Sequence, residues 1–369
     1  MIRVCEPNIG KKEFEYVKKC FDTNWISSQG PFVTEFEKKF AEYCDTKYGT
    51  SATNGTTALH LACATLGIGP GDEVIMPTFT MIASPNSVIY TGARPVWVDS
   101  EMETWNMDVP KIEKNITKKN KDIMVVHTFG LPVDMDPVLE IAKKHNLKVI
   151  EDAAESHGAL YKGKKVGGIG DVGCFSFYAN KLLTTGEGGM ITTNNEEYSE
   201  LAHTLMNHAF SKERHFWHKH IGFNYRLTNL QAAIGLAQLE RAEELLNLKL
   251  SVARRYTKAL TGVNGITTPP QANWAKNTYW MYGILVDKKK FGISKDDVMK
   301  ELEKKGIETR EFFIPMHTQP IYKKMGLDKG KYPIAERLNM QGLYLPSGTM
   351  LTEEQIHYIC ETLIKLKKK

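Results

Sequence analysis

The chain has 369 residues, of which 42% are hydrophobic and 25% charged, ordinary values for a soluble globular protein. Lys and Arg (48) exceed Asp and Glu (43) by only five, and the one dense basic run is the terminal Lys365–Lys369, so nucleic-acid binding has little support. The six cysteines are scattered without a Cys-x-x-Cys pair, which argues against a zinc ribbon or a disulfide framework and suits a reducing compartment.

The length and the hydropathy pattern set two further expectations. A chain of this length is too long for one compact core of ordinary size, so two domains are expected. Residues 1–10 lack the apolar core of a signal peptide, and no apolar run reaches the roughly 18 residues of a membrane span. We therefore expect a soluble, cytoplasmic protein with no membrane partner.

The first 50 residues predict two helices around a turn. Apolar residues recur at helical spacing in Lys11–Phe21 and again, after the turn Trp25–Pro31, in Phe32–Tyr43. From Tyr48 onward, short apolar runs alternate with helical stretches, which predicts a mostly parallel sheet covered by helices on both faces. The predicted strands are Glu73–Met76, Pro95–Val98, Ile123–His127, Val149–Glu151, Phe175–Tyr178 and Met190–Thr193. The predicted helices are Thr57–Leu66, Ile82–Tyr90, Pro137–His145 and Glu196–His208.

The last third of the chain predicts a second, α+β part. Thr228–Gln231 has the form of a capping box and opens a periodic segment that can run to about Leu260, a long helix that would join two lobes. Beyond Pro270 the predicted strands are Tyr279–Val286 and Glu308–Ile314, and the predicted helices are Lys295–Lys305 and Thr352–Lys365. We expect an N-terminal arm (1–11), a large domain (12–250) and a small C-terminal α+β domain (251–369), joined by the helix at about 228–260.

The stretch Phe175–Met190 carries the strongest chemical signal. An apolar strand ends at Asn180-Lys181, and the glycine-rich turn Thr184–Gly189 leads into the next apolar run. A lysine between two buried strands loses water, which lowers the pKa of its amine and makes the amine a nucleophile for carbonyls. The functional hypothesis is a Schiff-base lysine; the alternative is a solvated lysine at a strand end.

Three further segments bear on this hypothesis. Ser51–Ala58 leads small and hydroxyl residues into a helix, whose N-terminus suits a phosphate or simply has an N-cap. Asp152 follows a buried strand, where it could pair with a cationic ring nitrogen or cap the next turn. Gly222–Arg226 could serve a phosphate or form a structured loop. Together these residues fit pyridoxal phosphate, with a lysine for the aldehyde, an aspartate for the pyridine nitrogen and helix N–H groups for the phosphate.

Several motifs follow one another along nearly the whole chain. They are Trp25-Ile26-Ser27, Asn54-Gly55-Thr56, Glu151-Asp152-Ala153-Ala154-Glu155, Phe175-Ser176-Phe177, Asn180-Lys181, Gly186-Glu187-Gly188-Gly189, Asn224-Tyr225-Arg226, Thr278–Met281, Glu308–Arg310, Pro315–Thr318 and Leu345–Ser347. In this order they resemble the sugar aminotransferases of the DegT/DnrJ/EryC1/StrS group. The resemblance implies an α/β fold of the fold-type-I, aspartate aminotransferase-like class of pyridoxal phosphate-dependent transferases. Its large domain would hold a mostly parallel mixed sheet between helices, and a smaller α+β domain would follow.

The resemblance also implies roles for single residues. Lys181 is expected to carry the cofactor and Asp152 to pair with its pyridine nitrogen, both as catalytic residues, while Glu155 matches a position near the ring hydroxyl. Met81 stands where the family usually stacks an aromatic ring on the cofactor, so the stacking is expected to differ, although a thioether can cover a ring face. The expected phosphate contacts are Gly55, Thr56, Ser176 and, from the neighbouring subunit of a homodimer with shared sites, Asn224. The substrate-binding candidates are Trp25, Ser27, Arg226, Arg310 and His317.

The activity that this resemblance implies is a transamination. The enzyme would move an amino group from L-glutamate to C4 of a nucleotide-linked 4-keto-6-deoxy sugar, with pyridoxal 5′-phosphate as cofactor and pyridoxamine 5′-phosphate as its intermediate form. The favoured acceptor is GDP-4-keto-6-deoxy-D-mannose, which would give GDP-perosamine for O-antigen, lipopolysaccharide or another surface glycan. UDP- or dTDP-4-keto-6-deoxyglucose are alternative acceptors. A regulator or sugar sensor without turnover is an alternative of another class. The family's 3-dehydratases have histidine at the lysine position, and Lys181 argues against that activity.

Two other patterns resemble binding motifs, but we expect neither a dinucleotide site nor a metal site from them. Gly168–Gly173 satisfies Gly-x-Gly-x-x-Gly, but it precedes a strand instead of linking a strand to a helix, which argues against a dinucleotide site. His208, His215, His218 and His220 crowd one loop with a spacing that matches no standard zinc pattern, so no metal site is expected. A substrate-facing basic loop is favoured there, and solvent-exposed imidazoles are the alternative.

Overall fold

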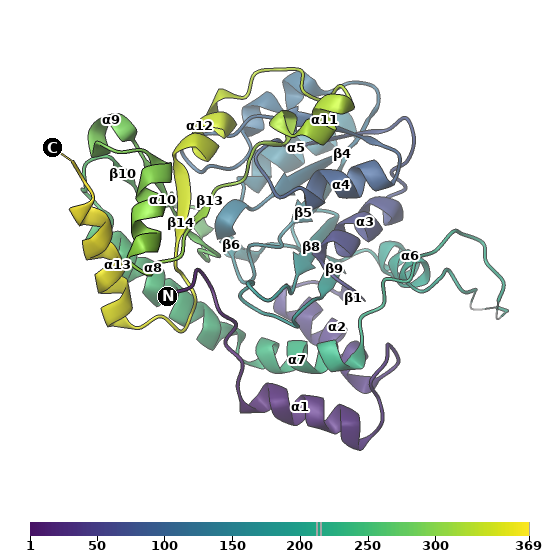
Figure 1. Cartoon of the computed structure of the whole chain (residues 1–369). Coiled ribbons are helices and arrows are strands. Elements are labelled where there is room, and N and C mark those ends of the chain that lie inside the picture. Colours follow the sequence, from purple (N-terminus) through teal and green to yellow (C-terminus); the bar gives the residue numbers. More distant parts are fainter. Residues whose placement is uncertain (212, 215, 369) are drawn as a thin grey trace.

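The computed structural model describes residues 1–211, 213–214 and 216–368 (Figure 1). Within them the largest sheet has seven strands, in the order β1 (Tyr48–Ala52), β9 (Gly189–Thr193), β8 (Val172–Ser176), β5 (Lys148–Asp152), β4 (Asn120–Val126), β2 (Glu73–Pro77) and β3 (Arg94–Val98). The strands from β8 to β3 pair in parallel, whereas β9 is antiparallel to both β1 and β8. The predicted α/β fold with a mostly parallel mixed sheet is confirmed.

Alternate side chains of these strands fill the cores on the two faces of the sheet. Val74, Met124 and Ile150 belong to one hydrophobic cluster, while the neighbouring Ile75 and Val149 belong to another. This period of two is what a sheet buried on both faces requires. One face is covered by α3 (Gly55–Thr65), α4 (Ala83–Tyr90) and α6 (Glu196–Met206), and the other by α2 (Pro31–Tyr43), α5 (Met135–His145) and α7 (Asn229–Glu240). α1 (Lys11–Asp22) packs on the outside of α7 (Figure 1).

The segment predicted as one long helix forms two. α7 begins with the expected capping box, in which Thr228 accepts a hydrogen bond from the Gln231 N–H. The chain leaves helical geometry at Arg241, and α8 then runs from Ala242 to Leu260. The guanidinium of Arg241 contacts Glu13 at 3.2 Å and Glu244 at 3.0 Å, so the break is tied to α1 as well as to α8.

A second, antiparallel sheet forms the centre of the C-terminal part. Its order is β10 (Ile266–Thr267), β12 (Tyr282–Val286), β14 (Gly342–Leu345) and β13 (Arg310–Glu311). This sheet shares a hydrophobic cluster with α8, α10 (Lys295–Lys304) and α13 (Glu353–Lys365). Figure 1 shows these elements gathered at one side of the seven-stranded sheet. The predicted domain boundary at residue 250 stays a proposal.

Both strands predicted in this part are shorter than expected. Tyr279 adopts a left-handed backbone conformation (φ 50°), so the strand begins only at Tyr282. The other strand pairs only at Arg310 and Glu311. The residues lost from the two strands include Trp280 and Phe313, whose side chains line the cavity described below.

The remaining elements are short connections. The helices are α9 (Lys288–Phe291), α11 (Pro320–Lys324) and α12 (Pro333–Gln341), and the 3-10 turns are Val109–Lys111, Glu113–Asn115, Thr128–Gly130 and Met316–Thr318. β11 (Ala275–Lys276) pairs with β6 (Leu160–Tyr161), which pairs with β7 (Lys164–Lys165), so a third sheet connects the two parts of the chain. In the part of the chain that the structure describes, no helix has the length and apolar character needed to cross a membrane.

The Gly-x-Gly-x-x-Gly segment wraps around a carboxylate of its own chain. Glu151 accepts hydrogen bonds from the N–H groups of Gly167 (2.9 Å), Ile169 (2.8 Å) and Gly170 (2.7 Å), and its Oε2 lies 3.0 Å from His127 Nε2. Burial alone would raise the pKa of Glu151, but these hydrogen bonds hold it below its ordinary value. The loop therefore binds a glutamate, and its glycines have a structural role.

Asp122 is a buried carboxyl group near the amino end of β4, an interior strand of the seven-stranded sheet. Its side chain is fully buried, and within the described residues neither of its oxygens has a hydrogen-bond partner. Burial raises the pKa of Asp122 to about 8, with Asp171 and Asp72 adding to the effect and Lys121 opposing it. At neutral pH the folded protein therefore keeps this group protonated.

Replacing Asp122 with asparagine is expected to stabilise the fold increasingly as the pH rises from about 4 to about 8. An unfolded aspartate ionises near pH 4, while folded Asp122 keeps its proton up to about pH 8, so ionisation favours the unfolded chain throughout this window. The gain in unfolding free energy can reach about 4 kcal/mol at pH 7. Thermal unfolding midpoints of both proteins across the window measure it, and a gap that does not change with pH would contradict the assignment.

Candidate active site

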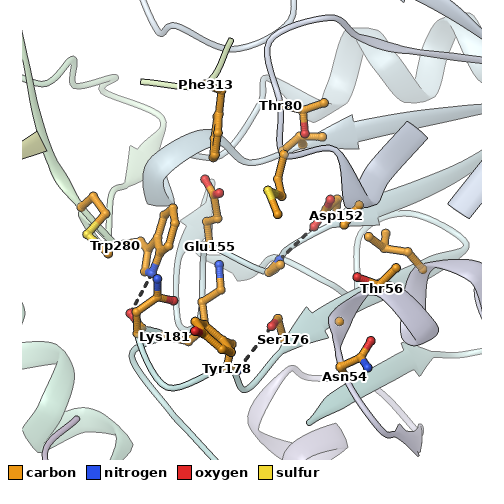
Figure 2. A pocket seen from close by; sticks show the side chains of 18 of the residues that line it. Asn54, Thr56, Thr80, Asp152, Glu155, Ser176, Tyr178, Lys181, Trp280 and Phe313 are labelled. Atoms are coloured by element: carbon orange, nitrogen blue, oxygen red, sulfur yellow. Dashed lines mark hydrogen bonds between the residues drawn. The ribbon is translucent and has the colours of Figure 1, made fainter. Parts of the chain in front are cut away.

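A cavity of about 890 Å³ lies at the carboxyl edge of the parallel strands. Val126, Asp152 and Ser176 are the last residues of β4, β5 and β8, and all three line it. This edge is where open α/β sheets bind ligands. Trp280, Phe313 and other residues of the C-terminal part close the opposite wall (Figure 2).

One end of the cavity is formed by the N-terminus of α3. Asn54 caps the helix by accepting the Thr57 N–H at 2.9 Å, and Gly55 and Thr56, which precede Thr57, line the cavity. A Cβ atom on Gly55 would lie 2.6 Å from Ser176 Cβ, so only glycine lets this helix end approach the end of β8 so closely. The first N–H groups of a helix lack acceptors within it and favour negative charge. Together with the Ser176 hydroxyl they form a cradle for an anion.

Asp152 lies deeper in the cavity with its carboxylate held in place. Its Oδ2 accepts the Ser84 hydroxyl at 2.7 Å, and its Oδ1 accepts the Ala154 N–H at 3.2 Å. Ser84 Oγ is also 2.9 Å from Thr80 Oγ1; because the single hydroxyl proton of Ser84 goes to Asp152, Thr80 donates to Ser84. Burial raises the pKa of Asp152, and these hydrogen bonds together with the charge of Lys181 oppose the rise.

Lys181 lies in the connection from β8 to β9, and Figure 2 shows its amine pointing into the cavity toward Glu155. Its Nζ lies 3.7 Å from the centre of the Trp280 ring. Burial lowers the pKa of Lys181, while Glu155 and Asp152 favour the charged form. The expected partial loss of water is therefore present, and a lysine in such a place can act as a nucleophile toward carbonyls.

Glu155 is a second titratable group beside this amine. It is buried, and its Oε2 accepts the Phe129 N–H at 2.8 Å. Burial raises the pKa of Glu155 to about 7, against the opposing charge of Lys181 and the Phe129 hydrogen bond. A carboxyl group with that pKa can take up or release a proton near neutral pH.

The cavity brings together most of the residues predicted from the sequence, but not all of them. Those that line it are Gly55, Thr56, Met81, Asp152, Glu155, Ser176, Lys181 and Arg310. Within this chain, Trp25, Ser27, Asn224, Arg226 and His317 do not line it. His317, in η4 (Met316–Thr318), is buried, and its Nδ1 lies 2.8 Å from Oγ1 of Thr78, the residue after β2, while its Nε2 lies 3.2 Å from Glu336 of α12.

The other four residues belong to two loops that meet at α7. Asn229, the first residue of α7, is buried; its N–H donates to Ser27 O at 2.7 Å and its Nδ2 to Trp25 O at 2.7 Å. Asn224 and Arg226, just before α7, contact each other through Arg226 Nε and Asn224 Oδ1 at 2.9 Å. Asn224 is exposed. These side chains are thus presented outside the cavity of their own chain.

Several lining residues were not predicted from the sequence, among them Asn54, Thr80, Tyr178, Trp280, Phe313 and Tyr344, together with Ser84 behind Asp152. Thr80 and Ser84 follow the end of β2 as Asp152 ends β5, so the rule for the carboxyl ends of strands could have found them. No local sequence pattern of this kind identifies Trp280 and Phe313. They line the cavity from residues just outside the short strands β12 and β13.

The histidine-rich loop after α6 extends away from the sheet (Figure 1). His218 Nδ1 lies 2.9 Å from His208 O, and His215 lies outside the described residues. Among the described side chains, no group of three or more His, Cys, Asp and Glu is placed so that it could hold a metal ion. Whether the loop faces a substrate stays a prediction.

Comparisons with known proteins extend over the whole chain. Residues 7–364 match the DegT/DnrJ/EryC1/StrS aminotransferase family. The chain is 48% identical over 365 residues to a GDP-perosamine synthase of Caulobacter vibrioides, covering 98% of this chain and 97% of that protein. It is 46% identical to a GDP-perosamine synthase of Escherichia coli O157:H7 over 362 residues, again 98% and 97% of the two chains. Among solved structures, the PLP-form of Spr1654 from Streptococcus pneumoniae superposes with a TM-score of 0.93 at 29% identity, covering 99% of this chain and 98% of that chain.

Proposed function

Since the chain belongs to the DegT/DnrJ/EryC1/StrS aminotransferase family, we propose that it moves an amino group from L-glutamate to C4 of GDP-4-keto-6-deoxy-D-mannose and so produces GDP-perosamine. The observation that carries this proposal is the 48% identity to a GDP-perosamine synthase over 98% of the chain. The cavity adds the chemistry, because it places an amine, an aspartate and an anion cradle together.

The cavity residues fit pyridoxal 5′-phosphate, the cofactor of this aminotransferase. Gly55, Thr56 and Ser176 would hold the phosphate, because the missing Cβ of Gly55 leaves a helix end and a hydroxyl facing one anion. Asp152 would pair with the ring nitrogen, and Lys181 would bind the aldehyde. When bound, the cofactor supplies a carbonyl that accepts amino groups and a ring that withdraws electrons from the neighbouring carbon.

Lys181 is the group proposed to move the proton. Its lowered pKa leaves a larger share of the amine neutral, so Nζ can take a proton from the donor's α-carbon and later return one to the sugar carbon. Asp152 stays ionised when it faces a cationic ring nitrogen, since an opposite charge lowers a carboxyl pKa. Glu155, with a pKa of about 7, can hold a proton beside the same amine. The aromatic wall of Trp280 and Phe313 limits the access of water.

Arg310 is the proposed anchor for the anionic parts of the substrates. It lines the cavity from β13 and remains largely exposed, with its guanidinium 3.6 Å from Glu308. A guanidinium can bind a carboxylate or a diphosphate through two parallel hydrogen bonds. Both L-glutamate and a nucleotide sugar carry such groups. His317, by contrast, is proposed to hold η4 against Thr78, because its ring is enclosed away from the cavity.

We further propose that two copies of the chain share their active sites. In support, Asn224, Arg226, Trp25 and Ser27 do not line their own cavity, and buried Asn229 ties the two loops that carry them. A phosphate at a helix N-terminus still has oxygens that face outward, which an amide from a neighbour can satisfy. Asn224 is the candidate for that contact, and the cofactor would then also stabilise the dimer.

Mixing two inactive variants is expected to restore part of the activity. If Lys181→Ala and Asn224→Ala subunits form mixed dimers with shared sites, one site carries both lesions and the other carries neither. Activity should then approach about one quarter of the wild-type value per site, because random pairing makes half of the dimers mixed and one of their two sites intact. Each pure variant must first be shown to be impaired. No recovery under conditions of proven subunit exchange would mean that Asn224 serves its own chain.

The nucleotide and the sugar are tested with a panel of acceptors. Purified enzyme with L-glutamate is offered the GDP-, UDP- and dTDP-linked 4-keto-6-deoxy sugars, and the amino sugar formed is followed by mass spectrometry. We expect the GDP-mannose derivative to give the highest kcat/KM. A preference for a UDP or dTDP sugar would overturn the proposed acceptor, and no turnover with any of them would favour a regulator or sensor.

The product's use and the enzyme's location are part of the same proposal. A nucleotide-linked amino sugar is an activated donor, which suits the synthesis of an O-antigen or another surface glycan. All six cysteines are free and five of them are buried, which is in keeping with a reducing compartment such as the cytoplasm.

A further inference from the structure

Trp280 lines the active site, and the segment that carries it, residues 278–280, packs against the loop at Gly130. Thr278 N donates to Gly130 O at 3.0 Å, and Gly130 has a φ of 100°. A Cβ atom on Gly130 would lie 2.6 Å from Thr278 Oγ1 and 3.0 Å from Trp280 N. The two backbones therefore fit together only with glycine at this position. This interlock fixes where the buried Trp280 side chain lies.

The indole of Trp280 makes two contacts with the Asn180-Lys181 dipeptide. Its Nε1–H donates to Asn180 O at 2.9 Å, and its ring face lies beneath the Lys181 amine, 3.7 Å from Nζ to the ring centre. Within the described residues, no hydrogen-bond acceptor or ion-pair partner reaches Lys181 Nζ. The ring face is thus the group that the amine contacts, and Figure 2 shows Trp280 beside Lys181, with Glu155 next to both.

We propose that Trp280 is the positioning residue for Lys181: its N–H fixes the peptide that carries the lysine, and its ring face holds the free amine inside the cavity. An aromatic face attracts an ammonium and also excludes water. A transaminase lysine must leave the cofactor and remain within reach while it moves protons. Contact with the Trp280 ring would keep the free amine within reach. The proposal rests on the proposed function, in which Lys181 is the reacting amine.

The charge state of Lys181 offers a readout that a merely structural tryptophan would not move. Glu155, Asp152 and Cys5 favour the charged amine, burial opposes it, and Lys181 in turn acts on buried His157. The indole face favours the charged amine as well. Replacing the Trp280 indole with an apolar side chain that has no ring is therefore expected to lower the pKa of Lys181 by about one pH unit.

The test compares three variants in the same fold. Trp280→Leu removes both contacts, and Trp280→Phe keeps a ring face but loses the N–H. Trp97→Phe is the matched control, since Trp97 is equally buried and its Nε1–H also donates to a backbone carbonyl, Leu327 O at 2.6 Å, away from the cavity. The apoproteins are acylated with acetic anhydride over a range of pH, and the label on Lys181 is quantified by peptide mass spectrometry to give its pKa. The kcat and KM of each loaded enzyme are measured beside it.

We expect Trp280→Leu to lower the pKa of Lys181 and to reduce kcat about 10- to 100-fold, with KM for L-glutamate changed less than about threefold. Trp280→Phe should fall between this variant and wild type, and Trp97→Phe should match wild type in both readouts. An unchanged pKa and kcat in folded Trp280→Leu, or equal losses in Trp97→Phe, would overturn the proposal. A wild-type enzyme that lacks cofactor on Lys181 would instead overturn the proposed function itself.

Discussion

Lys181→Ala is expected to abolish transamination and the absorbance of the lysine-bound cofactor. The substitution removes both the amine that would hold the aldehyde and the base that would move the proton, and loss of the base alone costs about 10²- to 10⁴-fold. We therefore expect kcat to fall by about four orders of magnitude or more, while the fold is kept. Steady-state assays and absorbance spectra of the purified variant measure both effects.

The matched control for this variant is a second buried lysine. Lys249 on α8 is buried and donates a hydrogen bond to Ser347 O, but it does not line the cavity. Lys249→Met removes a buried amine of similar size, and we expect it to keep the cofactor absorbance. Substantial turnover in Lys181→Ala, or loss of the absorbance in Lys249→Met but not in Lys181→Ala, would show that the wrong lysine was chosen.

Asp152→Asn is expected to reduce kcat about 10²- to 10³-fold with the cofactor still bound. The amide keeps the shape of the side chain and loses the negative charge that would keep the ring nitrogen protonated. Because one pKa unit is about 1.4 kcal/mol, losing two or three units of stabilisation of the protonated ring corresponds to this fall. The measurement is kcat together with a pH titration of the cofactor absorbance, in which the protonated ring should be lost at lower pH.

Ser84→Ala provides a graded comparison for this effect. Ser84 donates to Asp152 Oδ2 at 2.7 Å and does not line the cavity, so its loss leaves the charge in place and removes one restraint on it. We expect Ser84→Ala to reduce kcat about tenfold, a smaller loss than that of Asp152→Asn. The kcat should therefore decrease from wild type to Ser84→Ala and again to Asp152→Asn. Near-normal turnover in Asp152→Asn would mean that another carboxylate faces the ring, and Glu155 would be the next to test.

The parts of this protein that local patterns determine could be predicted from the sequence. The short apolar runs that alternate with helical stretches predict the sheet, and the capping box at Thr228 predicts the start of α7. Lys181 and Asp152 could be singled out because each follows a buried strand, where the end of one strand and the turn into the next determine its surroundings. The Gly-x-Gly-x-x-Gly segment precedes a strand, which argues against a dinucleotide site, and in the structure two of its N–H groups donate to Glu151.

The parts that depend on long-range packing could not be predicted in this way. Trp280 and Phe313 line the cavity from residues beyond the short strands β12 and β13, and Gly130 packs closely against the 278–280 segment that carries Trp280. Arg241, at the break between α7 and α8, pairs with Glu13 of α1, which is far away in the sequence. Contacts across a subunit boundary, such as the one proposed for Asn224, have no pattern within one chain.

The most direct test of the central claim is to locate the cofactor on the native enzyme. Borohydride reduces the bond between a lysine and the cofactor's aldehyde, and peptide mapping by mass spectrometry then identifies the lysine that carries the reduced cofactor. We predict a single modified peptide in which the cofactor is on Lys181. Attachment to any other lysine, or no attachment in an enzyme that is active, would contradict the account.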